Sequence, residues 1–301
     1  MRLHRKAMPG MKRRLFVKFL GLLLFLFWAG TSAGEGTVEP IGECFHGEAL
    51  KYDFGFWIFS RVGEGVATFH SLGNGMYEAF HEGRTLGFVG WITRHRRDVY
   101  RSTMGTIHGG TRLIPYRFEE DVMIGQKVRK RITVYDYAAR KISIETQEEG
   151  QINREEAEIP FGMIYDDPMT AFYNFRFGVY GKVEPGKEFF IHTVPQNESR
   201  KTIRLTVASK EEEERRRAAE TEKEGKDLFI KVHLDKELVG SLHGQVEVWF
   251  SQDIIPMAGV AKDVFFYGDI IGRLTYRGFS NPPEKINGQM GVEKLPPNNL
   301  E

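Results

Sequence analysis

Alternation of apolar and polar positions dominates the chain from about residue 48 onward. Apolar side chains recur at every second position from Leu50 to Phe56, and side chains two residues apart on a strand share one face. The same period of two continues from Val66 to His70, after the glycine-containing stretch Gly63-Glu64-Gly65. The pattern predicts two antiparallel strands joined by a tight turn at these glycines.

Further strand candidates follow at short, regular spacing, separated by glycine-rich turns such as Gly73-Asn74-Gly75 and Gly109-Gly110. No helix alternates with them, which argues against a parallel α/β architecture. The predicted class is mainly β: a curved, antiparallel, lipocalin-like sheet closed as a barrel or a sandwich. The predicted strands are Gly75 to His81, Thr85 to His95, Val99 to Thr106, Leu113 to Glu120, Lys127 to Tyr135, Lys141 to Thr146, Phe189 to Thr193, Lys201 to Ser209, Asp227 to Leu234, Gln245 to Ser251, Ile254 to Ala261 and Ile270 to Gly278.

One helix is predicted near residues 167–177. Asp167 followed by Pro168 is typical of an N-cap and a first helical position. Met169, Phe172 and the aromatic residues after it then fall near helical spacing. We expect this helix to plug or brace the sheet.

A charged insertion at residues 210–226 has no apolar face. Three Glu–Arg pairs four residues apart favour a solvated helix in a protruding connection; a docking role is the alternative. The pairs are Glu211 with Arg215, Glu212 with Arg216, and Glu213 with Arg217.

Residues 1–33 have the features of a secretory signal peptide: a basic stretch, an apolar run from Leu15 to Gly30, and small residues after it. Met11 is an alternative start. The competing interpretation is an uncleaved anchor, which needs about 20 apolar residues, whereas Lys18 interrupts this run. We expect a lead-in at 34–47, a single β-rich domain at 48–279 and a disordered tail at 280–301. The expected location is the periplasm or envelope, with no integral membrane span after cleavage.

Charge changes the picture once the signal peptide is set aside. The whole chain of 301 residues has a net charge of +1, but residues 1–33 hold seven basic residues and no acidic ones. Without them, 35 basic and 41 acidic residues remain, a net charge of −6. This balance predicts no nucleic-acid partner.

Cys44 is the only cysteine, so no internal disulfide can form. We expect a small buried residue at the start of the domain. Lipidation would need a cysteine immediately after the apolar run, and pairing with His46 as a nucleophile lacks an orienting third group.

Motifs that carry chemistry are sparse. Gly30-Thr31-Ser32-Ala33-Gly34 matches a nucleophile-elbow pattern, but it straddles the predicted cleavage site. The histidines lack zinc-protease spacing, and no glycine cluster continues into a phosphate-binding loop, so neither a metal nor a cofactor is predicted. The adjacent carboxylates Asp166 and Asp167 are best explained as a helix cap. Catalytic residues are therefore not assigned.

Trp57, Trp91 and Trp249 are the candidate ligand-binding residues. With the phenylalanine-rich strands they could line a cavity for an apolar or amphiphilic molecule. The alternative is that they fill the core.

The strands and the helix also resemble a bacterial exported family, domain of unknown function 3108, over about residues 48–279. Five landmarks occur in the family's order. They are Leu50-Lys51-Tyr52-Asp53-Phe54; Gly63, Gly65 and Ala67; Leu113-Ile114-Pro115-Tyr116-Arg117-Phe118; the helix from Asp167 to Arg176; and Val248-Trp249-Phe250-Ser251-Gln252-Asp253 before Ile255-Pro256. The insertion Lys210 to Lys226 and Met257-Ala258-Gly259 depart from the pattern. The resemblance implies an exported antiparallel β-domain of the Gram-negative envelope, with no catalytic residues to transfer.

Two function classes follow. The first is a non-enzymatic envelope protein that binds or scaffolds a lipid, a glycan or a protein partner. The second is a periplasmic hydrolase of envelope polymers, which would require several of His70, His81, His95, Asp166 and Asp167 to meet in one cleft. The first is preferred.

Overall fold

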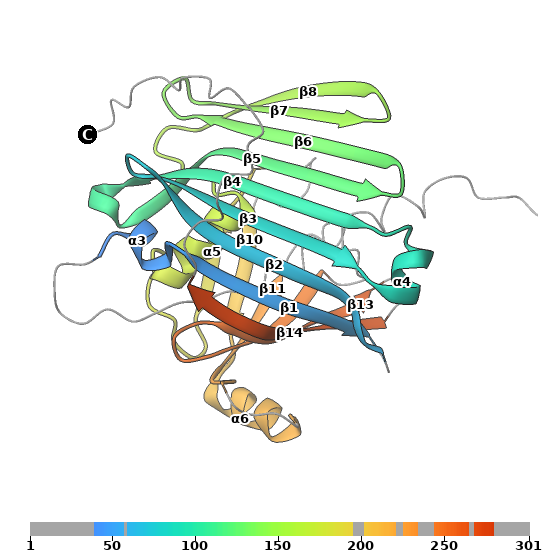
Figure 1. Ribbon diagram of the computed structural model, residues 1–301. Coiled ribbons are helices and arrows are strands. Elements are labelled where there is room, and N and C mark those ends of the chain that lie inside the picture. Colours follow the sequence, from blue (N-terminus) through green and yellow to red (C-terminus); the bar gives the residue numbers. More distant parts are fainter. Residues whose placement is uncertain are drawn as a thin grey trace, which may run out of the picture.

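A computed structural model describes residues 39–56, 59–194, 202–220, 225–233, 244–264 and 268–279. The predicted signal peptide, residues 34–38 of the lead-in, the predicted tail and Trp57 lie outside these residues. Within them, 14 strands form one antiparallel sheet (Figure 1).

The strands are β1 (Glu48–Phe56), β2 (Phe59–Gly73), β3 (Met76–Thr85), β4 (Arg97–Ile107), β5 (Arg112–Ile124), β6 (Lys127–Asp136), β7 (Lys141–Glu148), β8 (Gln151–Glu158), β9 (Glu188–His192), β10 (Thr202–Val207), β11 (Leu228–His233), β12 (Gln245–Phe250), β13 (Pro256–Val264) and β14 (Gly268–Phe279). The helices are α3 (Ile41–Phe45), α4 (Gly87–Ile92), the 3-10 turn η2 (His108–Gly110), α5 (Pro168–Phe177) and α6 (Lys210–Ala219).

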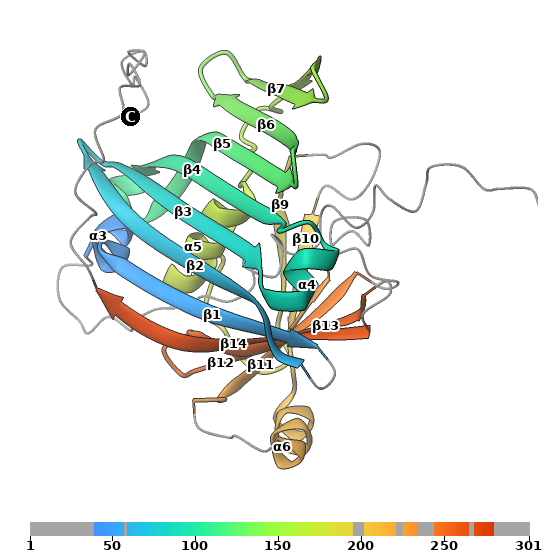
Figure 2. The ribbon, with the colours of Figure 1, turned by 45° about the vertical axis from the view of Figure 1, so that its right-hand side comes forward.

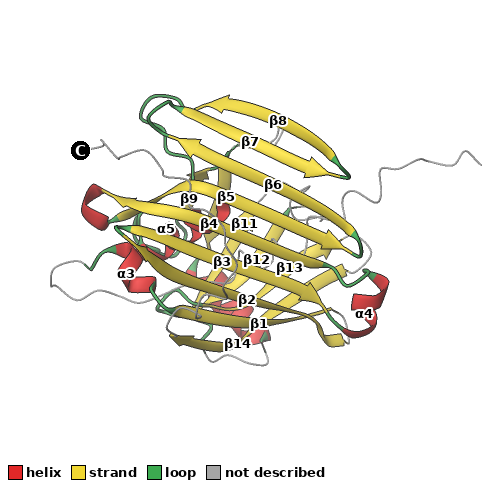
Figure 3. Ribbon diagram, turned by 45° about the horizontal axis from the view of Figure 1, so that its top comes forward, coloured by secondary structure: helices red, strands yellow, loops and turns green. Residues whose placement is uncertain are grey.

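The chain builds the sheet in two runs, the first from the middle to one edge and the second from the other edge back to the middle. Strands β1 to β8 follow one another as a meander, the chain then crosses through α5, and β9 to β14 return until β14 pairs with β1. The two runs form a front and a back layer with α5 between them (Figures 1 and 3). The edges β8 and β9 do not pair with each other. The predicted fold class and bracing helix are confirmed, and the sheet is barrel-like without being strictly closed.

The turn predicted at Gly63–Gly65 is wrong, because these glycines lie inside β2. In the register of β1 and β2, Gly63 is opposite Phe54 and Gly65 is opposite Tyr52. Both aromatic rings are fully buried. A glycine opposite an aromatic residue leaves room for the ring, so the glycines serve side-chain packing rather than chain reversal. By contrast, the predicted turn at Gly73-Asn74-Gly75 is confirmed, and all three residues have a positive φ.

The strand predicted from Thr85 to His95 is also wrong, since only Thr85 lies in a strand. β3 ends at Thr85, and α4 follows at once. Gly87 has φ +54°, a left-handed conformation that interrupts extended backbone. The Thr93 hydroxyl then donates to the Val89 carbonyl at 2.7 Å and closes the helical turn.

The charged insertion contains α6, which begins after Ser209 and lies outside the sheet (Figure 2). Two of the three predicted pairs form: Glu213 with Arg217 at 2.7 Å and Glu212 with Arg216 at 4.0 Å. No helix in the described part of the chain is long and apolar enough to span a bilayer.

Candidate ligand-binding interior

Helix α5 occupies one end of the space between the two layers, and its polar residues attach it there. The Asp167 carboxylate caps the helix by accepting from the Met169 and Thr170 backbone N–H groups. It also accepts from the Ser102 hydroxyl of β4 at 2.6 Å. Two turns later, the Asn174 side chain bonds both the N–H and the carbonyl of Leu113 in β5, each at 2.9 Å. The helix is therefore fixed to β4 and β5 in one position.

A second attachment is ionic. Arg176 donates from both of its terminal nitrogens to the Glu48 carboxylate, at 2.6 and 3.0 Å, and both side chains are fully buried. The guanidinium also lies 4.1 Å from the centre of the Phe45 ring. Glu48 is the first residue of β1, the strand at which the first run of the sheet pairs with β14 of the second run. The ion pair therefore attaches α5 to the junction of the two runs.

Asp166, directly before the helix cap, is a buried carboxyl group with several donors. Tyr180 donates to it at 2.5 Å, Arg112 at 3.0 Å and the Asn174 amide at 3.3 Å. Burial raises the pKa of Asp166 to about 6, although the Arg112 guanidinium acts in the opposite direction. The Asp166 N–H donates to His192 at the end of β9. This residue thus ties the α5 segment to the edge of the back layer.

The ring contact of Phe69 with Tyr173 of α5, at 4.4 Å, identifies the inner face of the front layer. Opposite residues in antiparallel register share a face, so the pairings Ala67 with His81 and His81 with Tyr100 place His81 inside. Burial lowers the pKa of His81 to about 3, so its imidazole is neutral at physiological pH.

Charged groups continue along this inner face toward α4. Asp98 and Arg96 form a buried, two-bonded ion pair, at 2.7 and 2.9 Å. On the next strands, the Arg131 Nε lies 3.6 Å from a Glu120 carboxylate oxygen. That Nε is buried and has no hydrogen-bond partner in the described part of the chain. The front layer therefore holds two ion pairs among the aromatic and aliphatic residues of its inner face.

The back layer carries aliphatic side chains on its inner face. The ring contact of Phe175 with Phe189 identifies its inner face, and the register from β9 to β12 places aliphatic side chains on it. These buried residues are Ile191, Leu205, Ile230, Val232, Val246 and Val248.

Burial of the inner faces is complete around α5 and partial elsewhere. Leu50, Phe69 and Leu113, near α5, are completely buried. Glu120 on the inner face of β5 and Ile203 on the inner face of β10 are only partly buried. A molecule between the layers at Glu120 and Ile203 would contact ionic groups on one side and aliphatic groups on the other.

The predicted tryptophan site is not assembled as one cavity. Trp249 alternates with the inward residues Val248 and Phe250, so it lies on the outer face of β12, where it packs on Phe229 at 4.8 Å and donates to Glu220 at 3.1 Å. Trp91 lies on α4 with 71% of its surface exposed. Trp57 falls outside the described residues. A ligand role for each of these tryptophans stays a prediction.

The candidate hydrolase residues, several of which would have to meet in one cleft, are also dispersed. His81 lies on the inner face of β3. His70 lies near His46 beside α3, His95 follows α4 at the other end of the sheet, and Asp166 and Asp167 hold α5. Among the described residues, no three His, Cys, Asp or Glu side chains are grouped as a metal site requires. Sequence analysis missed the Arg96–Asp98 and Glu120–Arg131 pairs, because a charged residue on a strand is ordinarily expected on the outer, solvated face and its type gives no sign of an inner position.

Comparison with known proteins places the chain in a family. A family model described as "Protein of unknown function (DUF3108)" matches residues 51–260, and the chain belongs to this family. A crystal structure described as a beta-barrel-like protein of domain of unknown function DUF1849, from Brucella abortus, is similar at 11% identity with a TM-score of 0.42. That similarity covers 78% of this chain and 98% of the other. No curated protein matches.

The family landmarks have structural roles here. Gly63 and Gly65 accommodate Phe54 and Tyr52, and Leu113 receives the Asn174 side chain. Asp167 and Arg176 attach α5. These landmark residues therefore pack β1 against β2 and attach α5 inside the sheet.

Proposed function

We propose that the protein is an exported, non-enzymatic binding protein of the cell envelope that holds an amphiphilic, lipid-like ligand between its two layers. One observation carries the proposal: two ion pairs lie on the inner face at β4–β6, opposite aliphatic side chains on β9–β12, and Glu120 and Ile203 on these faces are only partly buried. An acyl chain suits the aliphatic wall. The predicted signal peptide supports the location.

Arg131 is the group most suited to an acidic head group. Its Nε already lacks a hydrogen-bond partner among the described residues. A carboxylate or phosphate would supply a charge-assisted acceptor. A glycan or a protein partner would not need the aliphatic wall, so the observations favour a lipid.

The test measures thermal unfolding with oleate, for the wild type and for Arg131→Met. Oleate is expected to raise the melting temperature saturably, because a ligand that binds only the folded state stabilises it by about 2.7 kcal/mol at a hundredfold excess over Kd. Arg131→Met should weaken oleate binding by about tenfold, the loss of one charge-assisted hydrogen bond. It should leave the binding of oleyl alcohol unchanged.

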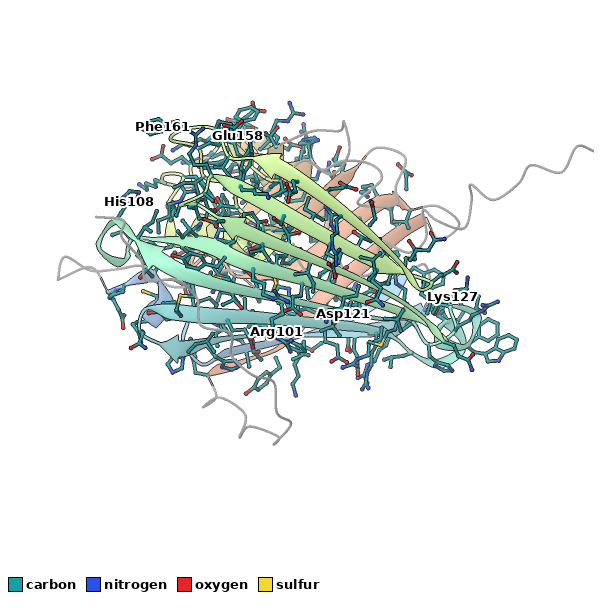
Figure 4. The ribbon with its side chains drawn as sticks, turned by 90° about the horizontal axis from the view of Figure 1, so that it is seen from above. Arg101, His108, Asp121, Lys127, Glu158 and Phe161 are labelled. Atoms are coloured by element: carbon teal, nitrogen blue, oxygen red, sulfur yellow. The ribbon has the colours of Figure 1, made fainter. Side chains whose placement is uncertain are left out.

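Arg101→Met is the matched control. Arg101 lies on the outer face of β4, 3.3 Å from Glu78 (Figure 4), so its loss should not change oleate binding. If oleate leaves the melting temperature unchanged, or if both arginine variants bind it equally well, the lipid proposal is wrong. Mass spectrometry of co-purifying molecules from the envelope would then distinguish a glycan from a protein partner.

A further inference from the structure

Helix α4 exposes three large apolar side chains at one end of the sheet. Phe88 is 68% exposed, Trp91 71% and Ile92 53%. The Phe88 and Trp91 rings stack on each other with their centroids 6.0 Å apart. Val128, at the start of the neighbouring β6, is also exposed. Isolated exposed apolar residues are ordinary, but several on one short element indicate an interaction surface.

The backbone holds this surface out in solvent. The Leu86 N–H donates to the Val62 carbonyl at 2.8 Å, which ties the start of α4 to β2. Gly90 is buried, and a Cβ there would lie 3.1 Å from the Thr85 carbonyl oxygen. At the other side, the Gly125 N–H donates to the Arg94 carbonyl at 2.8 Å. Because α4 is fixed at these points, its apolar side chains cannot fold back onto the sheet.

Basic residues flank the surface, and several of them are paired: Arg96 with Asp98, Arg97 with Glu82 and Lys127 with Glu149. The segment from Thr85 to Arg97 contains Arg94, Arg96 and Arg97 and no acidic residue. Arg94 is exposed and forms no ion pair within the described part of the chain, and it lies beside the turn that leads to Lys127. Figure 4 shows Lys127 at the α4 end of the molecule. This arrangement of basic, tryptophan-containing and apolar residues matches the interface of an anionic bilayer.

We infer that α4 is a membrane-docking element, which inserts Phe88, Trp91 and Ile92 into the interfacial region of an anionic phospholipid bilayer while Arg94 contacts the head groups. The inference does not depend on a ligand inside the sheet. The docked orientation would turn the α4 end of the sheet toward the membrane (Figure 2).

The exported form of the full chain is tested by co-sedimentation with vesicles. One set contains phosphatidylethanolamine and phosphatidylglycerol, and the other contains phosphatidylcholine alone. The double variant Phe88→Ser/Trp91→Ser should bind both sets about tenfold more weakly or worse, since two apolar side chains no longer leave water. Arg94→Gln should weaken binding about fivefold only for the anionic vesicles, because one basic residue near such a surface contributes about 1 kcal/mol.

Phe161→Ser is the matched control. Phe161 is 90% exposed but lies at the opposite end of the molecule (Figure 4), so its loss should leave vesicle binding unchanged. Wild-type tryptophan emission should shift to shorter wavelength with vesicles, and this shift should disappear in Trp91→Ser. All four variants alter exposed side chains, and unchanged melting temperatures would verify that they fold.

Three results would overturn the inference: no binding by the wild type, equal loss in Phe161→Ser, or concentration-dependent self-association that Phe88→Ser/Trp91→Ser abolishes, which would identify an interface between copies of this chain. Arg131→Met separates the two proposals. It should lower oleate binding without changing vesicle binding, and the double α4 variant should do the reverse.

Discussion

Helices α5 and α6 are both ten residues long, yet they satisfy their polar groups in opposite ways. In α5, every residue from Met169 to Arg176 is buried, and the polar ones bind specific groups on β1, β4 and β5. In α6, no residue is buried. The arginines on the side of α6 that faces the sheet lie over the outer face of that sheet, where Arg216 bonds Glu247 at 3.0 and 3.1 Å.

The comparison shows that the same kinds of side chain serve different ends according to their surroundings. Inside the sheet, each polar group that lost its partner would remain unsatisfied in a medium of low dielectric constant. Outside it, water replaces a lost partner at little cost. Polar substitutions in α5 should therefore be costly, and corresponding substitutions in α6 should not.

The largest expected effect is that of Arg176→Met. Its removal leaves Glu48 buried with only Arg277, at 3.4 Å, and breaking one side of a buried ion pair costs about 3–5 kcal/mol. Urea unfolding would measure the loss. Arg101→Met, which breaks an exposed pair, should cost at most about 1 kcal/mol. Adding Glu48→Leu to Arg176→Met should recover part of the stability, and a failure to recover any would mean that packing of the guanidinium on Phe45 dominates.

The second effect is a pH dependence of the folding stability, which comes from Asp166 directly before α5. Since the pKa of Asp166 is raised from 3.8 to about 6 in the folded protein, its contribution favours folding fully below about pH 3.8 and is lost as the pH rises to about 6. The difference corresponds to about 3 kcal/mol. Asp166→Asn should remove this component, seen as the difference between the two stability profiles from pH 4 to 7. Parallel profiles would contradict it.

His81 acts on the same range with the opposite sign. Its pKa is lowered from 6.5 to about 3, so its contribution favours folding above about pH 6.5 and is lost as the pH falls through that interval. Only the difference between wild type and Asp166→Asn therefore isolates the carboxyl group.

The third effect compares the two helix caps. Asp167→Ala removes two backbone and two hydroxyl partners inside the sheet and should cost about 2 kcal/mol or more. Ser209→Ala removes a single exposed 3.3 Å contact to the Glu212 N–H and should cost about 0.5 kcal/mol. Calorimetry of both variants would check the ratio, and equal losses would show that burial does not distinguish the helices.

The smallest effect concerns the contact of α6 with Phe229. Arg216→Ala removes the guanidinium 5.0 Å from the centre of the Phe229 ring and its two bonds to Glu247. Glu247 is buried but keeps Gln245 and Lys262 as partners, so the loss should cost about 1 kcal/mol. Arg215→Ala in the same helix alters an exposed residue and should cost nothing measurable. Thermal unfolding monitored by tryptophan emission follows both, and equal effects would mean that α6 contributes charge alone.

Much of the fold could be predicted from local patterns, and the interior could not. The alternation from Leu50 to Phe56 predicted a strand that the structure contains, whereas β8, from Gln151 to Glu158, was missed because its residues are almost all exposed and polar. The tryptophans were expected to line a cavity, but an aromatic side chain suits either face of a strand. Trp249 faces outward because its neighbours Val248 and Phe250 take the inner positions.

By itself, the sequence determined the antiparallel strands, the glycine turn at Asn74, the capped helix after Asp167 and membership of the family. Each depends on spacing or on residues adjacent along the chain, and local backbone preferences act over that distance. Only the tertiary structure decided that Glu48 and Arg176, 128 residues apart, meet in the interior, and that α4 interrupts a predicted strand and stays exposed. Those outcomes depend on which side chains, distant along the chain, come into contact in the folded protein. A buried charge destabilises the fold when it has no partner, and removing one member of a buried ion pair destabilises it as well.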